Sequence, residues 1–593
     1  MTTTLRFRLA DLFFLVVSLS ATLTRGEELD VPKVPRSPKV PVALAWGDQP
    51  LRLYVALRDA RMIAVIDPEA WRVETEWALP FRPVSLALGT GGETLLVGGL
   101  EGQAAVLDRL GMQLHAFPAG RGPTRLVPLP RRRIAIVSLW DPAVRIFEDR
   151  GTEPVAIYPL PFAPGPLVLV RGDRLVVADA FGGHLAVLDP DQPGPPRLFP
   201  FDGVGISALR PSREGQELLL VHMEQRGPVP VNEANIDQGR VLSSRLSGVK
   251  LIDLESDARS SLPLKRRQVI LDGPEHGAAD PSDLALSPDG TKILVALAGS
   301  HQVLKSDRTI YSQSPDSSGL LPLGHSQSLH VREVGRSPLA IVFHPRGELV
   351  VTADAMSDRL TVLKVADLSI VKTLHLSPTP LARTPAQRGE ALFLDGSRSM
   401  DRWMSCASCH RAGHTNGLNF DTLGDGNYGW PKNTPSLRGV GRTEPFGWNG
   451  AFPKLADQVH QSLESSLQGG RPSKQVIDDL VAYLNTLEPP PARRKSDESV
   501  DRGKQVFRDR GCVTCHRPSL YTTPALRDVD MPDGAGNRRF NPPSLRGVAW
   551  TSPYFHDGRA LSLEDVLKVH PPGGESRIKG QELADLIRFL ESL

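Results

Sequence analysis

Apolar and polar residues alternate in short runs from about residue 45 to residue 375. Runs rich in Val, Ile and Leu are followed by a polar turn and then by a second alternating run that often ends at Asp. This period of two predicts pairs of half-buried β-strands joined by tight turns. The first run of each pair begins at residues 53, 95, 134, 175, 218, 293 and 349.

The pairs recur at intervals of about 40 residues, a spacing typical of the blades of a β-propeller. Seven openings predict an all-β, seven-bladed propeller over residues 45–378. Wider intervals leave room for inserted loops around residues 225–245 and 300–330. An aperiodic β-sandwich is the alternative interpretation of the same strands.

Beyond residue 380, helical spacing replaces the alternation, and two blocks of sequence occur twice. The block 433–440 is repeated at 541–548, and the block 479–484 is repeated at 585–590. The second pair has apolar residues at i, i+3, i+4 and i+7, which is the pattern of an amphipathic helix. We therefore expect two similar, mainly α-helical domains. Their predicted bounds are 385–488 and 500–593, with helices at 388–394 and 501–508 and a Pro-rich linker at 489–499.

The first residues are typical of an export signal. Arg6 and Arg8 precede an uncharged, largely apolar stretch at residues 12–23. That stretch is too short to span a bilayer, which takes about 20 residues, so it predicts a signal peptide over residues 1–26. An uncleaved membrane anchor is the alternative. A signal peptide implies a protein that is periplasmic or otherwise exported, and soluble after export.

Charge adds one exclusion. The formal net charge of the 593-residue chain is only +2. Domains that bind nucleic acid usually carry a strongly basic patch or stripe, so we expect no nucleic-acid partner.

All four cysteines lie in two Cys-x-x-Cys-His motifs. The motifs are Cys406, Cys409 and His410, and Cys512, Cys515 and His516. In such a motif two thioether bonds hold the edge of a haem and the adjacent His binds its iron, so the sequence predicts two covalently bound c-type haems. A redox-active or zinc-binding cysteine pair is the alternative.

With these motifs, residues 385–593 resemble the bacterial di-haem cytochrome c peroxidase family, which includes the methylamine-utilisation di-haem oxygenating enzyme. The resemblance rests on the segment from Thr551 to Gly558, on Leu563 with Glu564, and on the block 541–548. Residues 403–417 resemble the subgroup in which this unit follows a YVTN-type propeller, and the blades resemble that repeat. The resemblance implies a multidomain chain with a propeller followed by two cytochrome c domains.

In that family the C-terminal haem is six-coordinate and accepts electrons from a redox partner. Its second ligand is usually a Met, and the corresponding position here is His570. The resemblance therefore implies that His516 and His570 bind this iron together. Imidazole in place of a thioether lowers the reduction potential, because Met raises it. The alternative is that His570 is merely exposed.

The N-terminal haem handles peroxide in the family, and a Trp lies between the two haems. Trp448 occupies that position. The family's general-base Glu is replaced by Gln468, and Glu464 lies one helical turn away and would substitute only if the local register shifts. Since an amide cannot move a proton between peroxide oxygens as a carboxylate does, the resemblance leaves peroxidase activity open.

Two further ligand sets follow from the resemblance. The sixth position of the first iron is either open or held by one of four candidates: Tyr428, His460, His414 or Met404. The family also binds calcium between its domains through an Asn side chain and backbone carbonyl groups, and oxygen ligands suit this ion. The matching residues are Asn433, Thr551 and Pro553.

Together these features predict an exported di-haem oxidoreductase of cytochrome c peroxidase type. Electrons from a small redox protein would enter at the second haem and pass Trp448 to an oxidant, hydrogen peroxide in the family, at the first. Two alternatives remain open. One is a non-enzymatic electron-transfer cytochrome whose propeller docks a protein partner, with the small redox protein as donor or acceptor. The other is a di-haem enzyme that oxidises a protein substrate held by the propeller.

Overall fold

The computed structural model describes residues 37–593 except 193, 256–262, 274–275, 308–328, 380 and 571–577. The predicted signal peptide at residues 1–26 lies outside the described residues, as does most of the predicted insertion at 300–330. Within the described part of the chain, no helix is both long and apolar enough to cross a membrane.

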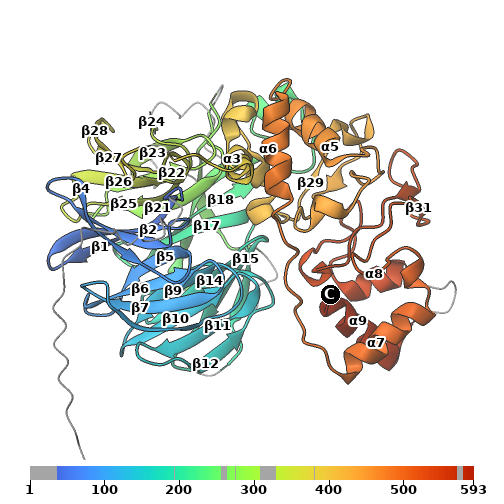
Figure 1. Cartoon of the computed structure of the whole chain (residues 1–593), viewed down its shortest axis with the longest axis horizontal. Coiled ribbons are helices and arrows are strands. Elements are labelled where there is room, and N and C mark those ends of the chain that lie inside the picture. The colour runs from blue at the N-terminus through green and yellow to red at the C-terminus, as the bar shows by residue number, and fades with distance from the viewer. Residues whose placement is uncertain are drawn as a thin grey trace, which may run out of the picture. The chain divides into compact units, whose positions relative to one another are not determined.

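Seven four-stranded antiparallel sheets follow one another along the chain (Figure 1). The first three are β1 (Pro41–Asp48) to β4 (Arg72–Ala78) with β2 (Leu51–Leu57) and β3 (Met62–Asp67), then β5 (Pro83–Leu88), β6 (Thr94–Gly99), β7 (Gln103–Asp108) and β8 (Gln113–Pro118), then β9 (Thr124–Leu129), β10 (Arg133–Ser138), β11 (Asp141–Glu148) and β12 (Pro154–Pro159). The fourth and fifth are β13 (Pro164–Val170), β14 (Arg174–Asp179), β15 (His184–Leu188) and β16 (Arg197–Pro200), then β17 (Val204–Pro211), β18 (Glu217–Glu224), β19 (Ser243–Lys250) and β20 (Arg266–Ile270). The last two are β21 (Pro281–Leu286), β22 (Lys292–Leu297), β23 (Gln302–Asp307) and β24 (His330–Glu333), then β25 (Pro338–Phe343), β26 (Leu349–Asp354), β27 (Arg359–Lys364) and β28 (Ile370–His375).

The innermost strands close these sheets into a ring. Each first strand contacts the first strand of the next sheet, and β25 contacts β1. The predicted seven-bladed propeller is therefore confirmed. The runs that begin at 53, 95 and the five later positions are the second strands of the blades, β2 to β26.

The apolar core of the propeller lies between neighbouring blades, which explains the sequence pattern. Leu53, Val55 and Leu57 of β2 pack against Val351 and Ala353 of β26 across the closure of the ring. A second strand is covered on both faces, so it is apolar throughout and easy to recognise. The outermost strands, such as β4, are largely exposed and carry charged residues.

One blade carries a long insertion between β18 and β19. It spans residues 225–242 and includes the short helix α1 (Glu233–Asp237), whose N-cap Asn232 accepts a hydrogen bond from the backbone of Asn235. The 3₁₀ helix η1 (Leu251–Leu254) follows β19. The insertion predicted around 225–245 thus has its own local structure.

After the propeller the chain forms two helical segments with the same plan. The first contains α3 (Pro385–Phe393), α4 (Cys406–Cys409), α5 (Leu455–Gln461), the π-helical turn η9 (Ser462–Ser466) and α6 (Lys474–Leu484). The second contains α7 (Glu498–Asp509), the 3₁₀ helix η10 (Cys512–Thr514), α8 (Leu563–Val569) and α9 (Gly580–Glu591). Short strand pairs accompany them, β29 (Asn419–Phe420) with β30 (Lys432–Asn433), and β31 (Arg527–Asp528) with β32 (Arg539–Phe540). Further 3₁₀ turns are η3 (Ala355–Ser357), η4 (Gly396–Arg398), η5 (Met400–Arg402), η6 (Arg411–Gly413), η7 (Leu423–Asp425), η8 (Val440–Arg442) and η11 (Val548–Trp550).

The first and last helices of each segment cross at a glycine. A Cβ on Gly503 of α7 would lie 1.9 Å from the carbonyl oxygen of Asp585 in α9, so only Gly permits this approach. Arg502 then forms an ion pair with Asp585 at 2.7 Å. Gly389 of α3 makes the same approach to Asp479 of α6. This crossing fixes the frame in which each Cys-x-x-Cys-His motif lies.

Candidate haem sites

The first motif begins a one-turn helix with a complete N-cap. The Ser405 side chain accepts a hydrogen bond from the backbone of Ala407 at 3.0 Å, and the Ser405 backbone donates to Ser408 Oγ at 2.9 Å. His410 ends the turn, and its Nδ1 lies 3.3 Å from the carbonyl oxygen of His414. With the proton on Nδ1, Nε2 is left for iron.

The second motif repeats this arrangement. His516 Nδ1 lies 3.0 Å from the carbonyl oxygen of Tyr521. Burial lowers the pKa of His516, and it lowers the pKa of His410 to about 4, so both imidazoles are neutral, which is the form that binds iron. All four cysteines are free thiols rather than disulfides. These donors fit two covalently attached haems.

Apolar residues surround both motifs. Cys406 and Cys409 pack against a buried cluster that includes Trp403, Met404 and Leu463. Cys512 packs against a second cluster that includes Val548 and Leu563. Burial also raises the pKa of Cys406 to about 12. Each motif therefore lies in surroundings that exclude water, as a porphyrin site requires.

His570 lies directly after α8, and its backbone N–H donates to the carbonyl of Val566 at 2.8 Å. The pKa of His516 is lowered chiefly by burial and further by the charge of His570. His570 itself is exposed, and binding of one iron by both His516 and His570 stays a prediction.

The four candidates for the sixth position of the first iron have different surroundings. His414 is fully buried, and its Nδ1 and Nε2 are 2.9 Å from Ser436 Oγ and 2.8 Å from the carbonyl oxygen of Trp550. Both nitrogens therefore have partners in the chain, and His414 would have to give up one of these hydrogen bonds to bind iron. Tyr428 donates its hydroxyl to the carbonyl of Val231, Met404 is buried in the apolar cluster, and His460 lies beside Glu464.

The position of the family's general base is also defined. Gln468 Nε2 donates to the carbonyl oxygens of Ser465, at 2.5 Å, and Val231, at 3.3 Å. Glu464 lies in the π-helical turn η9, where the register does shift, but its carboxylate is exposed and 3.4 Å from His460. The shift therefore does not carry Glu464 into the apolar cluster.

The two halves hold each other through equivalent asparagines. Asn433 donates its Nδ2 to the carbonyl of Pro553 at 2.6 Å and its backbone N–H to the carbonyl of His556 at 2.7 Å. Asn541 donates in the same way to the carbonyls of Pro445 and Trp448. Each half thus places an Asn against the other half's loop, which explains why the block containing it occurs twice.

Trp448 lies at this junction. Its Nε1–H donates to the carbonyl of Asn433 at 2.8 Å, and its own carbonyl accepts the backbone N–H of Asn541 at 2.9 Å. The first partner belongs to the first half and the second partner to the second half. Trp448 is therefore bonded to both segments that carry the Cys-x-x-Cys-His motifs, its indole to the first and its backbone to the second.

The calcium ligands that the resemblance implies are close together in part. Asn433 Oδ1 is buried and has no hydrogen-bond partner among the described residues, so it is free to bind a cation. Its Nδ2, however, already donates to the Pro553 carbonyl, which would have to exchange that partner for the ion. Thr551 donates its hydroxyl to the carbonyl of Val548. Calcium binding stays a prediction.

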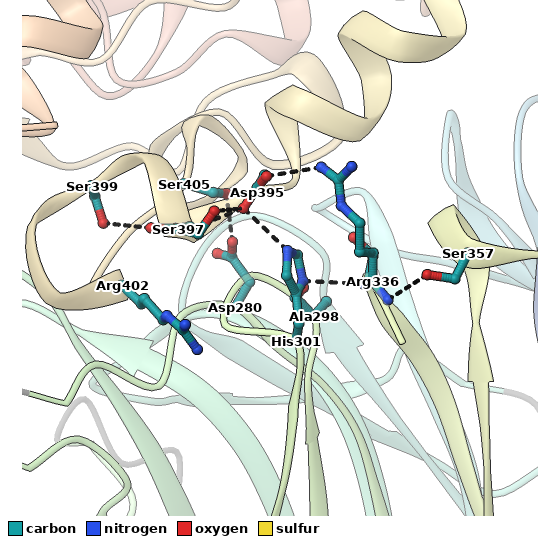
Figure 2. A network of polar contacts seen from close by, with 12 residues as sticks. Asp280, Ala298, His301, Arg336, Ser357, Asp395, Ser397, Ser399, Arg402 and Ser405 are labelled. Atoms are coloured by element: carbon teal, nitrogen blue, oxygen red, sulfur yellow. Dashed lines mark hydrogen bonds and ion pairs between the residues drawn. The ribbon is translucent and has the colours of Figure 1, made fainter. Parts of the chain in front are cut away.

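Sequence reasoning missed a contribution of the propeller. Asp280, which precedes β21, accepts a hydrogen bond from Ser405 Oγ at 2.5 Å (Figure 2). It also accepts one from Ser408 Oγ at 2.6 Å, and these two serines flank Cys406 in the sequence. Next to it, Asp395 accepts bonds from His301 at 3.1 Å and Arg336 at 2.8 Å (Figure 2). The propeller therefore binds the first haem motif directly through a half-buried carboxylate.

A second propeller contact involves aromatic rings. The buried Trp140 packs edge-on against His414 and Trp550, with ring centroids 5.4 and 5.5 Å apart, and Phe181 packs against His414 at 4.6 Å. One propeller side chain thus touches both cytochrome segments. No sequence signal marks Trp140, because it lies in a loop between strands.

Comparison with known families agrees with this geometry. Residues 384–488 match the family model described as di-haem cytochrome c peroxidase, and residues 500–593 match the model described as cytochrome c. The C-terminal part of the chain therefore consists of a domain of the di-haem cytochrome c peroxidase family followed by a cytochrome c domain. The predicted family and fold class are thereby confirmed, and covalently bound haem c follows from the two cytochrome c domains.

Two proteins with similar sequences each align with about two fifths of the chain. The methylamine utilization protein MauG of Methylorubrum extorquens is 28% identical over 313 residues, which cover 42% of this chain and 88% of that protein. The cytochrome c551 peroxidase of Pseudomonas aeruginosa is 24% identical over 306 residues, covering 41% of this chain and 87% of that protein. Among solved structures, a chain of Kuenenia stuttgartiensis hydrazine synthase aligns with a TM-score of 0.48 at 15% identity, over 57% of this chain and 99% of that chain.

Proposed function

We propose that the chain is an exported di-haem oxidoreductase that passes electrons from a small redox protein to an oxidant such as hydrogen peroxide. Haem held at Cys406 and Cys409 and at Cys512 and Cys515 supplies the one-electron chemistry. His410 and His516 are the proximal ligands, and His570 is the second ligand of the C-terminal iron. Export is supported by the apolar stretch at residues 12–23.

The observation that carries this proposal is the position of Trp448. A carrier with two independent haem domains needs no aromatic group fixed by backbone hydrogen bonds to both halves. Here the indole is bonded to Asn433, whose side chain binds the Pro553 carbonyl of the second segment, and the Trp448 backbone is bonded to Asn541, so the residue is held at the junction of the two segments. Trp448 is therefore the residue through which we expect the two sites to exchange electrons.

The surroundings of Gln468 bear on which oxidant is used. Its amide donates to two backbone carbonyls and has no basic atom for proton transfer. The carboxylate of Glu464 is turned to the surface beside His460. We therefore propose that the chain handles its oxidant without the family's carboxylate, and that reaction with peroxide depends on an open sixth position at the first site.

Replacing Trp448 tests the proposed path. In Trp448→Phe we expect electron transfer between the two sites to slow by about tenfold or more, equivalent to a barrier higher by about 1.4 kcal/mol. Stopped-flow absorption after reduction by a small redox protein measures this rate. Trp430→Phe is the matched control, because that indole is in the same domain but partly exposed. Equal rates in Trp448→Phe and the control would refute the path.

A further inference from the structure

The insertion at residues 225–242 leaves the propeller and enters the apolar cluster at the first haem motif. Val231, Ile236, Val241 and Leu242 are each at most 3% exposed, and they belong to the cluster against which Cys406 and Cys409 pack. Residues on both sides of α1 thus contribute. The insertion is therefore part of this apolar cluster and is not a surface loop.

Backbone hydrogen bonds join the insertion to the first cytochrome segment. The Val231 N–H donates to the carbonyl of Asp421 at 2.8 Å, in a parallel bridge between Pro230 and Asp421. Gln225 Nε2 donates to the carbonyl of Asn419, in β29, at 2.9 Å. The insertion therefore lies along β29, the strand that pairs with β30 and so with Asn433.

The Val231 carbonyl accepts hydrogen bonds that join the insertion to the first cytochrome segment. It accepts the Tyr428 hydroxyl at 2.9 Å and Gln468 Nε2 at 3.3 Å. Both donors come from the first cytochrome segment. Since Val231 is only 2% exposed, water does not replace a lost donor freely, and an unpaired buried carbonyl is costly.

Gln468 is held in an unusual backbone conformation for this contact. Its φ is +51°, in the left-handed region that non-glycine residues rarely adopt. The next residue, Gly469, is so close to the backbone of Arg398 that a Cβ there would clash at 1.7 Å. Leu467 accepts a backbone hydrogen bond from Met400 at 3.0 Å. The surrounding chain therefore fixes where the amide points.

We propose that the insertion 225–242 packs over the first haem motif as part of its apolar surroundings and that Gln468 is the positioning residue that holds it there. The inference rests on haem attachment at Cys406 and Cys409. It gives a physical reason for an amide where the family has Glu. A carboxylate at position 468 would face the carbonyl oxygens of Ser465 and Val231 with no proton to donate, so this contact with Val231 needs a donor such as the Gln amide.

Hydrogen–deuterium exchange on the full-length holoprotein tests this inference. In Gln468→Glu we expect amide exchange in peptides from residues 226–242 to rise by about tenfold, since one buried hydrogen bond becomes a repulsion. Gln458→Glu is the matched control on α5. That amide donates to Ser462 Oγ, whose hydroxyl donates to the Gln458 carbonyl. Neither bond involves the insertion, so exchange at residues 226–242 should stay as in the wild type.

The result of the exchange experiment either supports or overturns the proposal. Unchanged exchange at 226–242 in Gln468→Glu, with both haems retained, would overturn the proposal, because the insertion would then be held without this residue. If Gln468→Glu does not take up haem, Gln468→Ala and Tyr428→Phe replace it. Each removes one donor to Val231 without adding charge, and exchange equal to wild type in both would equally overturn it. Hydrogen exchange is measured without redox turnover. The proposed function can therefore fail while this inference stands, and the inference can fail while the proposed function stands.

Discussion

Asp280 shows how one side chain outside the cytochrome segments acts on a haem site. Ser405 Oγ already accepts the backbone N–H of Ala407, and Ser408 Oγ already accepts that of Ser405. Each hydroxyl proton is therefore available for Asp280, whose two oxygens accept them. Burial raises the pKa of Asp280, but both oxygens are acceptors, so we assign the ionised form.

The negative charge of Asp280 should lower the reduction potential of the first haem. A half-buried carboxylate beside the first haem motif favours the oxidised, more positive iron, so Asp280→Asn should raise the potential of that haem by roughly 60 mV, about tenfold in a one-electron equilibrium. Spectroelectrochemical titration measures both haems separately. Asp354→Asn is the matched control, because Asp354 is a buried propeller carboxylate that also accepts two hydroxyl bonds, from Thr352 and Thr361. Equal shifts in the two variants would show that the effect is not local.

Which single residues could be predicted from the sequence depends on how they act. The haem cysteines and histidines act through side-chain type and spacing, so two short motifs reveal them. Val231 acts through its backbone carbonyl, which every residue has, and no pattern marks it. Asp280 acts across more than 120 residues of sequence by a contact that exists only in the fold. His414 is a chemically plausible ligand whose two nitrogens are used elsewhere.

Among the helices and strands, the crossing of α7 with α9 and of α3 with α6 is the common element of the two halves. The sequence predicts a short helix before each Cys-x-x-Cys-His motif, at 388–394 and 501–508, and the structure has these helices at Pro385–Phe393 and Glu498–Asp509. It does not predict which glycine lies at a crossing, because this depends on tertiary packing. The π-helical turn η9 is likewise invisible in the pattern.

Replacing a crossing glycine tests this frame. Gly503→Ala should destabilise the second haem domain by about 1–3 kcal/mol, since a methyl group forces α7 away from α9. Thermal unfolding of the holoprotein, followed by calorimetry and by the absorption of its haems, measures the loss. Gly151→Ala is the control, because a Cβ there meets no atom closer than 3.5 Å. If Gly503→Ala unfolds at the same temperature as the wild type, the close approach of α7 and α9 does not contribute to stability.

At the scale of the whole molecule, loops of the propeller contact the di-haem unit. Alternating strands predict the blades because each second strand is covered on both faces by its neighbours. They do not predict that Asp280, Trp140 and the insertion 225–242 contact the cytochrome segments, since these residues lie in loops. The propeller thus contributes the Asp280 carboxylate, the Trp140 ring and the apolar residues of the insertion to the surroundings of the first motif.

The central claim is that the iron at the first motif has an open sixth position for an oxidant and that this site receives electrons from the second. Electron paramagnetic resonance and absorption spectra of the oxidised protein, followed by addition of hydrogen peroxide to the fully reduced form, test it most directly. We predict one high-spin and one low-spin ferric haem, with rapid reoxidation by peroxide despite Gln468. Two low-spin haems with slow or no reaction would contradict the claim and would identify the chain as an electron carrier.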